Sequence, residues 1–329
     1  MSVIVPIRNE APHLETAVAS ILEQDYPVPF DVCLAVAPSV DDTDQIAEAL
    51  AADRHSVSVV PNPAGVTPAG LNAAIRATQG SIVVRVDGHA ALSPGYIRRA
   101  VETMCRTGAV NVGGLQVPQP ETRFEEAVAT ATTSWLGTGG ATYRVGGQEG
   151  PVDTVYLGVF DRAAGDASGW FDESLIRNQD YEFNIRLRKA GGRVWFDPEL
   201  AVGYRPRGSW RALVKQYFEY GCWKSKVAHM HPESLRVRQL VAAVIMPCLV
   251  ITAAAAVRFR IARLLGLGYA LAVMSASLRA PRSALRVGGV VACSQAAWSC
   301  GFIARPIVDL LEQTRQRDQN STTSSGLSR

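Results

Sequence analysis

Apolar and polar residues follow two different patterns along the first two thirds of the chain. Short, nearly continuous apolar runs predict buried strands, and the segments between them carry apolar residues three and four positions apart, which predicts amphipathic helices. The expected strands lie at 3–7, 30–37, 57–60, 81–86, 109–115, 155–160 and 194–196. The expected helices lie at 13–24, 46–50, 68–78, 94–106, 124–134 and 181–190. This alternation predicts an α/β fold with a parallel, doubly wound sheet.

One segment of the α/β region does not fit either pattern. Residues 137–150 contain six glycines among fourteen positions. So many glycines disfavour a regular element, and long irregular loops in compact domains are often functional. We expect a mobile loop here and regard it as a candidate lid over a site.

The last third of the chain has a different pattern. Three stretches without a charged residue, 240–257, 264–278 and 287–304, are separated by short links that contain arginine. The outer two have 18 residues each, the lower limit for crossing a bilayer, and the middle one has 15. We expect two or three membrane-embedded helices; buried helices of a soluble domain are the alternative. Because every link is basic, the positive-inside rule gives successive spans contradictory orientations.

These patterns divide the chain into four parts. An α/β domain covers 1–208, and 209–235 contains a helix with aromatic residues on one face and basic residues elsewhere, as expected at a membrane surface. The membrane-embedded helices lie within 236–308. The tail 309–329, with a serine and threonine run and no hydrophobic cluster, is expected to be disordered. The N-terminus lacks the basic start and long apolar core of a secretory signal, so we expect the first domain to stay in the cytoplasm.

Charge and cysteine content exclude some functions. The formal net charge of +3 is too small to indicate a nucleic-acid partner. The six cysteines include no Cys-x-x-Cys pair, which indicates neither a disulfide framework nor a zinc site.

The strand at 81–86 ends in Asp87-Gly88-His89. Ligands of open α/β sheets bind where parallel strands end, so this is a candidate site. Asp87 and His89, two apart on an extended chain, point the same way and are able to hold one divalent ion between them. The alternative is a simple turn, in which Asp87 begins the turn and Gly88 supplies a positive φ.

Five motifs resemble, in order and spacing, those of the family-2 glycosyltransferases. They are Val3-Ile4-Val5-Pro6-x-Arg8-Asn9-Glu10, Ser39-x-Asp41-x-Thr43, Leu71-Asn72 with Ala77 and Gly80, Val86-Asp87-x-His89-Ala90, and Asn178-Gln179-Asp180-Tyr181-Glu182. The last motif and the run from Gln216 to Lys224 are most similar to the membrane-bound bacterial glucosyltransferases of the succinoglycan type.

The resemblance implies a GT-A fold, built on a doubly wound mixed sheet and followed by C-terminal membrane helices. This fold binds a nucleotide-diphosphate sugar, with a divalent cation across the diphosphate. The family's Asp-x-Asp appears here as Asp87-Gly88-His89. The His89 imidazole replaces a carboxylate, so the site has one negative charge fewer. This change favours Mn²⁺ over Mg²⁺. We hypothesise that His89 still contacts the metal or the diphosphate.

The resemblance also implies a set of donor-binding residues. They are Pro6, Arg8, Asn9, Glu10, Asp41, Arg85 and Asp87. Ala37-Pro38 replaces the Asp-Gly that many members carry, so a contact to the nucleotide base is missing. Two of these residues have alternatives, since Asp41 is equally suited to cap a helix and Arg85 to pair with a neighbouring acid.

Asp180 matches the family's catalytic base, and Gln179 stands where a partner carboxylate often lies. A helix N-cap is the alternative for Asp180. Gln216 and Trp223 faintly resemble a signature of processive members, or else they pack the helix against the membrane. Together with Gln179, they are the candidates for acceptor binding or for a lid.

The expected protein is therefore a membrane-bound, inverting glycosyltransferase with a cytoplasmic catalytic domain. Its implied donor is a UDP-linked glucose or similar hexose, and its implied acceptor a lipid-linked saccharide or glycolipid. Transfer directly to a polyprenyl phosphate and a degenerate, non-catalytic membrane scaffold are the alternatives.

Overall fold

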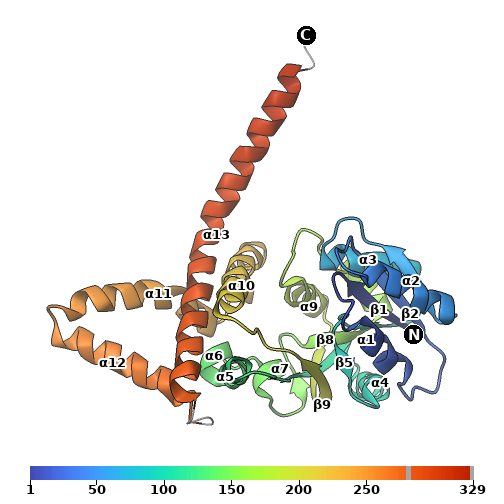
Figure 1. The fold of residues 1–329 in the computed structure, drawn as a ribbon, viewed down its shortest axis with the longest axis horizontal. Helices are drawn as coiled ribbons and strands as arrows, with labels where there is room; N and C mark the ends of the chain where they lie inside the picture. Colours follow the sequence, from blue (N-terminus) through green and yellow to red (C-terminus); the bar gives the residue numbers. More distant parts are fainter. Residues whose placement is uncertain (279–282, 327–329) are drawn as a thin grey trace. The chain divides into compact units, whose positions relative to one another are not determined.

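The computed structural model describes residues 1–278 and 283–326. The chain divides into two units, Met1–Pro206 and Arg207–Arg329. The first unit contains the sheet and the second is helical (Figure 1).

The first unit is built on a nine-stranded mixed sheet. The strands are β1 (Ser2–Ile7), β2 (Asp31–Val36), β3 (Val57–Pro61), β4 (Ile82–Arg85), β5 (Ala91–Leu92), β6 (Asn111–Pro118), β7 (Gly150–Pro151), β8 (Tyr156–Asp161) and β9 (Val194–Tyr204). Their spatial order is β3-β2-β1-β4-β8-β6-β9-β5, and β7 pairs with β9.

Strand direction differs between the two halves of this sheet. β1 to β4 are parallel, as the alternation predicts, whereas β8 runs antiparallel to both β4 and β6. The GT-A type of mixed α/β sheet is confirmed, and the wholly parallel sheet is wrong. A strand buried on both faces reads the same in either direction, so the apolar run alone does not reveal the reversal.

Helices cover both faces of the sheet. They are α1 (Leu14–Leu22), α2 (Thr43–Asp53), α3 (Thr67–Ala77), α4 (Tyr96–Thr107), α5 (Arg123–Thr132), α8 (Arg162–Ser168) and α9 (Gln179–Lys189). Val3 and Val5 of β1 join the core formed with α1 and α4, while Ile4 joins the core formed with α3 and α9. The period of two along a buried strand thus supplies both layers of a doubly wound domain.

An aromatic cluster fixes α9 on its face of the sheet. The Phe183 ring of α9 lies 5.5 Å from the rings of Phe160 and Trp170 and 4.9 Å from that of Phe171, measured between centroids. Offset aromatic pairs of this kind add to the free energy gained by burial. They hold the start of α9 at the edge of β4.

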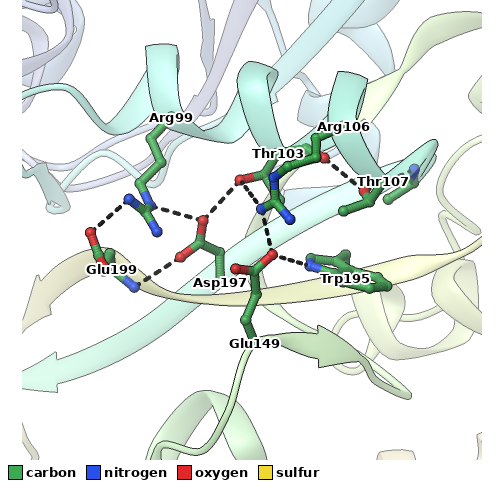
Figure 2. A network of polar contacts seen from close by, with 9 residues as sticks. Arg99, Thr103, Arg106, Thr107, Glu149, Trp195, Asp197 and Glu199 are labelled. Atoms are coloured by element: carbon green, nitrogen blue, oxygen red, sulfur yellow. Dashed lines mark hydrogen bonds and ion pairs between the residues drawn. The ribbon is translucent and has the colours of Figure 1, made fainter.

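A polar network fixes α4 on β9 (Figure 2). The carboxylate of Asp197, which is fully buried, accepts hydrogen bonds of 2.9 Å from Arg99 Nε and Thr103 Oγ1. Arg106 and Trp195 both donate to Glu149 Oε1. Buried carboxylates need such partners, so this network holds α4 against β9 and against the residue that precedes β7.

The glycine-rich segment is not the irregular loop that its composition predicts. It contains two short helices, α6 (Trp135–Thr138) and α7 (Thr142–Val145), which end at Gly139 and Gly146 with φ of 61° and 80°. Glycine commonly ends helices because it adopts positive φ without strain. The glycines therefore mark helix ends, and the role of the segment as a lid stays a prediction.

Among its described residues, the second unit contains four long helices. They are α10 (Trp210–Met230), α11 (Val237–Ala256), α12 (Arg260–Ser275) and α13 (Ala284–Gly326), with a 3-10 turn at Pro232–Ser234. Within this unit α11 and α12 form a hairpin beside α13 (Figure 1).

The disorder of 309–329 stays a prediction, although α13 continues into this tail as far as Gly326. Its glutamine, glutamate and arginine residues are good helix formers, and no glycine interrupts the sequence between Gly301 and Gly326. Residues 327–329 lie outside the described part of the chain.

Candidate active site

The carboxyl end of β4 contains a buried ion pair. Arg85 is 7% exposed, and its Nε and Nη2 atoms donate to Asp87 Oδ1 at 3.2 and 3.0 Å. Arg85 is the last residue of β4, so the strand itself holds the guanidinium in place. The sequence left two roles open for Arg85, and this structure places it against the neighbouring acid.

The Arg85 guanidinium also links two distant motifs. Burial opposes its charge, but the carboxylates of Asp87 and Asp180 outweigh burial and raise the pKa of Arg85. Asp180 belongs to α9, far from Asp87 in sequence. The structure therefore brings the predicted metal ligand and the predicted base to one positive centre.

Asp180 does not cap α9. The N-cap position is Asn178, whose φ of 60° is left-handed and whose side chain makes no capping hydrogen bond. Asp180 lies in the first turn, where its Oδ1 accepts a 2.8 Å hydrogen bond from the backbone N–H of Tyr181. Gln179 is buried beside it. Asp180 thus lies at the positive end of the helix dipole, where a negative charge interacts favourably with the free backbone N–H groups.

The Asp87-Gly88-His89 segment lies tightly against the loop that follows β1. His89 Nδ1 and Glu10 Oε1 are 2.8 Å apart, so these two side chains share a hydrogen bond. A Cβ at Gly88 would lie 2.8 Å from Ile7 Cγ2 and 3.1 Å from Glu10 Cγ. Asp87 does begin a turn, because its carbonyl accepts from the Ala90 N–H at 2.9 Å. Gly88 is absent from the positive-φ residues of the described chain, so the predicted positive φ is wrong and a close approach requires this glycine.

Hydrogen bonds connect the loop after β1 to the loop after β2. Asn9, with φ of 54°, donates its N–H to Ser39 Oγ and accepts from the N–H of Val40, while Glu10 donates its N–H to Thr43 Oγ1. The strands are parallel, so both loops emerge at the same edge of the sheet as Asp87.

Asp41 belongs to this loop network. Its carboxylate accepts from the Thr43 hydroxyl at 2.5 Å, from the Thr43 N–H at 3.2 Å and from the Ala11 N–H at 3.3 Å. The Thr43 hydroxyl is the largest influence that lowers the pKa of Asp41. The N-cap of α2 is Asp42, so Asp41 does not occupy the cap position. It accepts instead from the first residue of the helix and from Ala11, and so ties the start of α2 to the β1 loop. A direct donor contact stays a prediction.

The two remaining donor-binding candidates flank this network. Pro6 lies within β1, in register with Ala35 of β2. Arg8 is exposed, and its Nη1 donates to the Gly65 carbonyl at 3.2 Å, next to α3. Arg8 thus lies at the same edge of the sheet, with its charge accessible to an anion.

Asp87 and His89 are the residues that would hold a divalent cation. Among the described residues, no three His, Cys, Asp or Glu side chains cluster closely enough to enclose a metal. Mg²⁺ and its relatives at phosphate-transfer sites use one or two carboxylates and complete their coordination with substrate phosphates and water. The donor set fits a cation that is bound together with a diphosphate.

The sequence analysis missed two residues that shape the site. One is Asn178, whose left-handed backbone sets the direction of α9; asparagine before a polar helix start is the available signal. The other is Asn72 on α3, quoted only as part of a motif. It donates to the Phe171 carbonyl and the Glu173 carboxylate and accepts from the Phe171 N–H, which secures the chain that leads to α9.

Gln216 and Trp223 both lie on α10, in the second unit. Gln216 Nε2 donates to Tyr220 Oη at 3.0 Å. The Trp223 ring has the Lys226 ammonium at 5.2 Å and the Arg305 guanidinium at 4.9 Å from its centroid. These contacts fit helix packing, and an acceptor role for the two residues stays a prediction.

Comparisons with known proteins agree with this geometry. The family described as Glycosyl transferase family 2 matches residues 2–166. The succinoglycan biosynthesis protein ExoA of Rhizobium meliloti is 30% identical over 247 residues, which cover 74% of this chain and 75% of that protein. Glycosyltransferase AglE of Haloferax volcanii is 26% identical over 239 residues, which cover 72% of this chain and 76% of that protein.

Two solved structures share the fold. The mannosyltransferase PcManGT from Pyrobaculum calidifontis, in complex with GDP-Man and Mn²⁺, aligns with a TM-score of 0.66 and 20% identity over 92% of this chain and 86% of that one. S. aureus TarS 1-349 in complex with UDP aligns with a TM-score of 0.52 and 13% identity over 92% of this chain and 90% of that one. At such identities these likenesses establish the fold.

Proposed function

Since the chain belongs to glycosyltransferase family 2, and is thus a glycosyltransferase, we propose that it transfers a hexose from a nucleotide-diphosphate sugar to a lipid-linked acceptor with inversion. Glucose is the proposed hexose, and a saccharide on a lipid carrier or a glycolipid is the proposed acceptor. The observation that carries the proposal is the buried Arg85, which pairs with Asp87 and acts on Asp180 at the same edge of the sheet.

Asp180 is the proposed base. As the acceptor oxygen attacks the anomeric carbon, Asp180 takes the hydroxyl proton, and the nucleotide diphosphate leaves from the opposite face of the sugar. A base for this step must be ionised before the reaction. Asp180 lies in the first turn of α9, and its charge interacts with the Arg85 guanidinium closely enough to help raise the pKa of Arg85.

Asp87 and His89 are the proposed ligands of a divalent cation, Mn²⁺ or Mg²⁺, which would neutralise charge on the departing diphosphate. The hydrogen bond to Glu10 orients the His89 ring, and Arg85 orients the Asp87 carboxylate. The proposed donor-facing residues Pro6, Arg8 and Asn9 line the same edge.

The relatives' names support a place in glycan assembly on lipid carriers. One is a succinoglycan biosynthesis protein, and another, from Methanococcus voltae, is a glucuronosyltransferase whose name includes a dolichyl sugar phosphate. A UDP-linked donor is proposed for this chain. The long apolar helices of the second unit support attachment to a membrane, where such acceptors reside, with the catalytic unit in the cytoplasm.

The test is a donor panel on membranes that contain the full chain. Radiolabelled UDP-glucose, UDP-N-acetylglucosamine and GDP-mannose are each supplied with Mn²⁺ or with EDTA, and lipid extracts are analysed by mass. We expect Mn²⁺-dependent labelling from UDP-glucose, and loss of at least about 100-fold in rate for Asp180→Asn with unchanged donor binding. The matched control is Asp53→Asn, at the exposed end of α2.

Each other result rejects a stated part of the proposal. Near-normal turnover by Asp180→Asn rejects this base. An acid-labile, phosphate-linked monosaccharide as the sole product supports direct transfer to polyprenyl phosphate. Neither transfer nor hydrolysis of any donor supports a non-catalytic scaffold.

A further inference from the structure

The second unit contains two helices that are both long and apolar enough to cross a membrane, yet they are packed differently. In the most apolar part of α11, 6% of the residues are buried within the protein, whereas in that of α13, within 284–307, 44% are buried. Composition alone does not distinguish the two helices. They differ in that a neighbouring helix, α10, packs against α13.

α10 lies against α13 from Gly289 to Arg305. A Cβ at Gly289 would lie 3.2 Å from the Trp210 ring, and one at Gly221 would lie 2.0 Å from the Trp298 carbonyl oxygen. Farther along, the Arg305 guanidinium lies over the Trp223 ring. The two helices therefore run in the same direction, side by side and in very close contact.

Charged residues recur along α10 at the levels where it meets α13. They are Arg211, Lys215, Glu219, Lys224 and Lys226. Lys215 is largely exposed, and its Nζ lies 3.9 Å from Glu219 Oε1. If α13 crossed the hydrocarbon of a bilayer, α10 would have to enter with it. Five charged side chains on one helix make that strongly unfavourable.

The hairpin of α11 and α12 has the opposite character. Its apolar side chains are exposed around both helices: Val237, Leu240, Val241, Val244, Val250 and Ile251 on α11, and Ile261, Leu264, Leu265, Leu267 and Leu271 on α12. At about 1.5 Å per residue, the 20 residues of α11 match the roughly 30 Å of a bilayer core. The 16 residues of α12 reach about 24 Å, so its crossing requires local thinning of the bilayer and extension of the Arg260 and Arg263 side chains from the tip toward the headgroups. At the tip, Arg263 Nε donates to the Ala256 carbonyl at 2.8 Å, which satisfies one free carbonyl of the α11 end.

Both ends of the hairpin return to α13. Ser299 Oγ donates to the Ala243 carbonyl near the start of α11, and a Cβ at Gly288 would lie 2.9 Å from Met274 Sδ near the end of α12. The tip is exposed at Val257 and Phe259. The hairpin thus leaves the α10 and α13 pair and comes back to it.

We propose that the α11–α12 hairpin alone crosses the lipid bilayer, twice, and that α13 lies with α10 at the membrane surface. Both ends of the chain are then on one side of the membrane, and the arginines of the hairpin tip reach the other. The α11 and α12 surfaces are covered by lipid acyl chains. This inference is independent of the donor and acceptor proposed above.

Labelling of cysteines in sealed membrane vesicles tests this topology. The full chain, with Cys248, Cys293 and Cys300 replaced by alanine, retains the exposed Cys105 as a reporter of the first unit. One variant carries an added cysteine after Arg329 and another carries Arg258→Cys. A membrane-impermeant maleimide is expected to label Cys105 and the added C-terminal cysteine from one face, and the R258C site from the other face only.

Two results would overturn the proposal. Labelling of Cys105 and the C-terminal cysteine from opposite faces means an odd number of crossings. Labelling of the R258C site from the Cys105 face means that the hairpin does not cross.

A second measurement compares two exposed isoleucines. Ile251 on α11 is 67% exposed and Ile303 on α13 is 47% exposed. We expect Ile251→Lys to lower the protein retained in membranes after alkaline extraction by about tenfold or more, because its charge would enter hydrocarbon. Ile303→Lys should leave retention within about twofold of normal, because lysine at the surface keeps its ammonium in water. Equal losses for both variants would contradict the proposal.

Discussion

The end of β4 and the loop after β1 both supply polar side chains to the site, but they are held in different ways. At β4 a buried guanidinium pairs with Asp87 and acts on Asp180. In the loop, exposed residues are held mainly by hydrogen bonds to the β2 loop. Charge interactions strengthen in buried surroundings, whereas water readily replaces exposed hydrogen bonds. We therefore expect substitutions at β4 to affect the chemical step and those in the loop to affect donor affinity.

The largest effect is expected at Arg85. Arg85→Met leaves Asp87 without its partner and removes the cation that interacts with Asp180, so kcat should fall by about 100-fold or more. The free energy of unfolding should fall by about 2 kcal/mol, less than for a fully buried pair because Asp87 is partly exposed. Steady-state kinetics at saturating Mn²⁺ and thermal denaturation measure the two effects.

Arg85→Lys is the matched control for charge. Lysine keeps the positive charge but cannot donate from two nitrogens of a planar fork, so activity between that of the wild type and of Arg85→Met is expected. A wild-type kcat in Arg85→Met would show that the end of β4 does not affect the chemical step more than the loop after β1 does.

A smaller effect is expected where the two regions meet, at the contact between Glu10 and His89. Glu10→Gln keeps a hydrogen-bonding group but removes the charge that supports the basicity of the imidazole. Loss of such an outer partner typically lowers metal affinity by about 10- to 100-fold, so the Mn²⁺ concentration for half-maximal rate should rise by about tenfold. Glu15→Gln, in the first turn of α1, is the control. An unchanged Mn²⁺ titration would separate His89 from the metal.

The first half of the fold could be predicted from the sequence because its elements are local. The strands β1 to β4 and the helices between them each carry their own apolar period, and the parallel order follows. The direction of β8 could not be predicted, since it depends on pairing with β4 and β6 rather than on its own residues. The α6 and α7 helices were missed because their terminal glycines resemble loop composition.

The candidate site shows the same limit. Motif order was enough to nominate Asp87, Asp180 and Asp41. It did not determine which group each carboxylate contacts, because Arg85 and Thr43 reach them only in the folded chain. Nor did it show why Gly88 is required, since the nearby Ile7 and Glu10 belong to another strand end.

A modest effect on kcat is expected at Asn178, the left-handed residue before Asp180. A left-handed backbone costs alanine about 1 kcal/mol, and glycine adopts it freely. Asn178→Ala should therefore misdirect the first turn of α9 and lower kcat about fivefold, with little change in donor KM. Asn178→Gly, the matched control, should stay within about twofold of the wild type. Equal losses in both variants would instead indicate that the asparagine side chain itself is needed.

The smallest effect is expected at Asp41, in the exposed loop region. Asp41→Asn keeps one acceptor oxygen for Thr43 and the Ala11 N–H but removes the charge. Because water substitutes for exposed hydrogen bonds, we expect donor KM to rise by about two- to threefold and kcat to stay unchanged. Initial rates over a range of donor concentrations measure this. A loss in kcat as large as that of Arg85→Met would mean that the loop takes part in the chemical step, and the contrast between the two regions would fail.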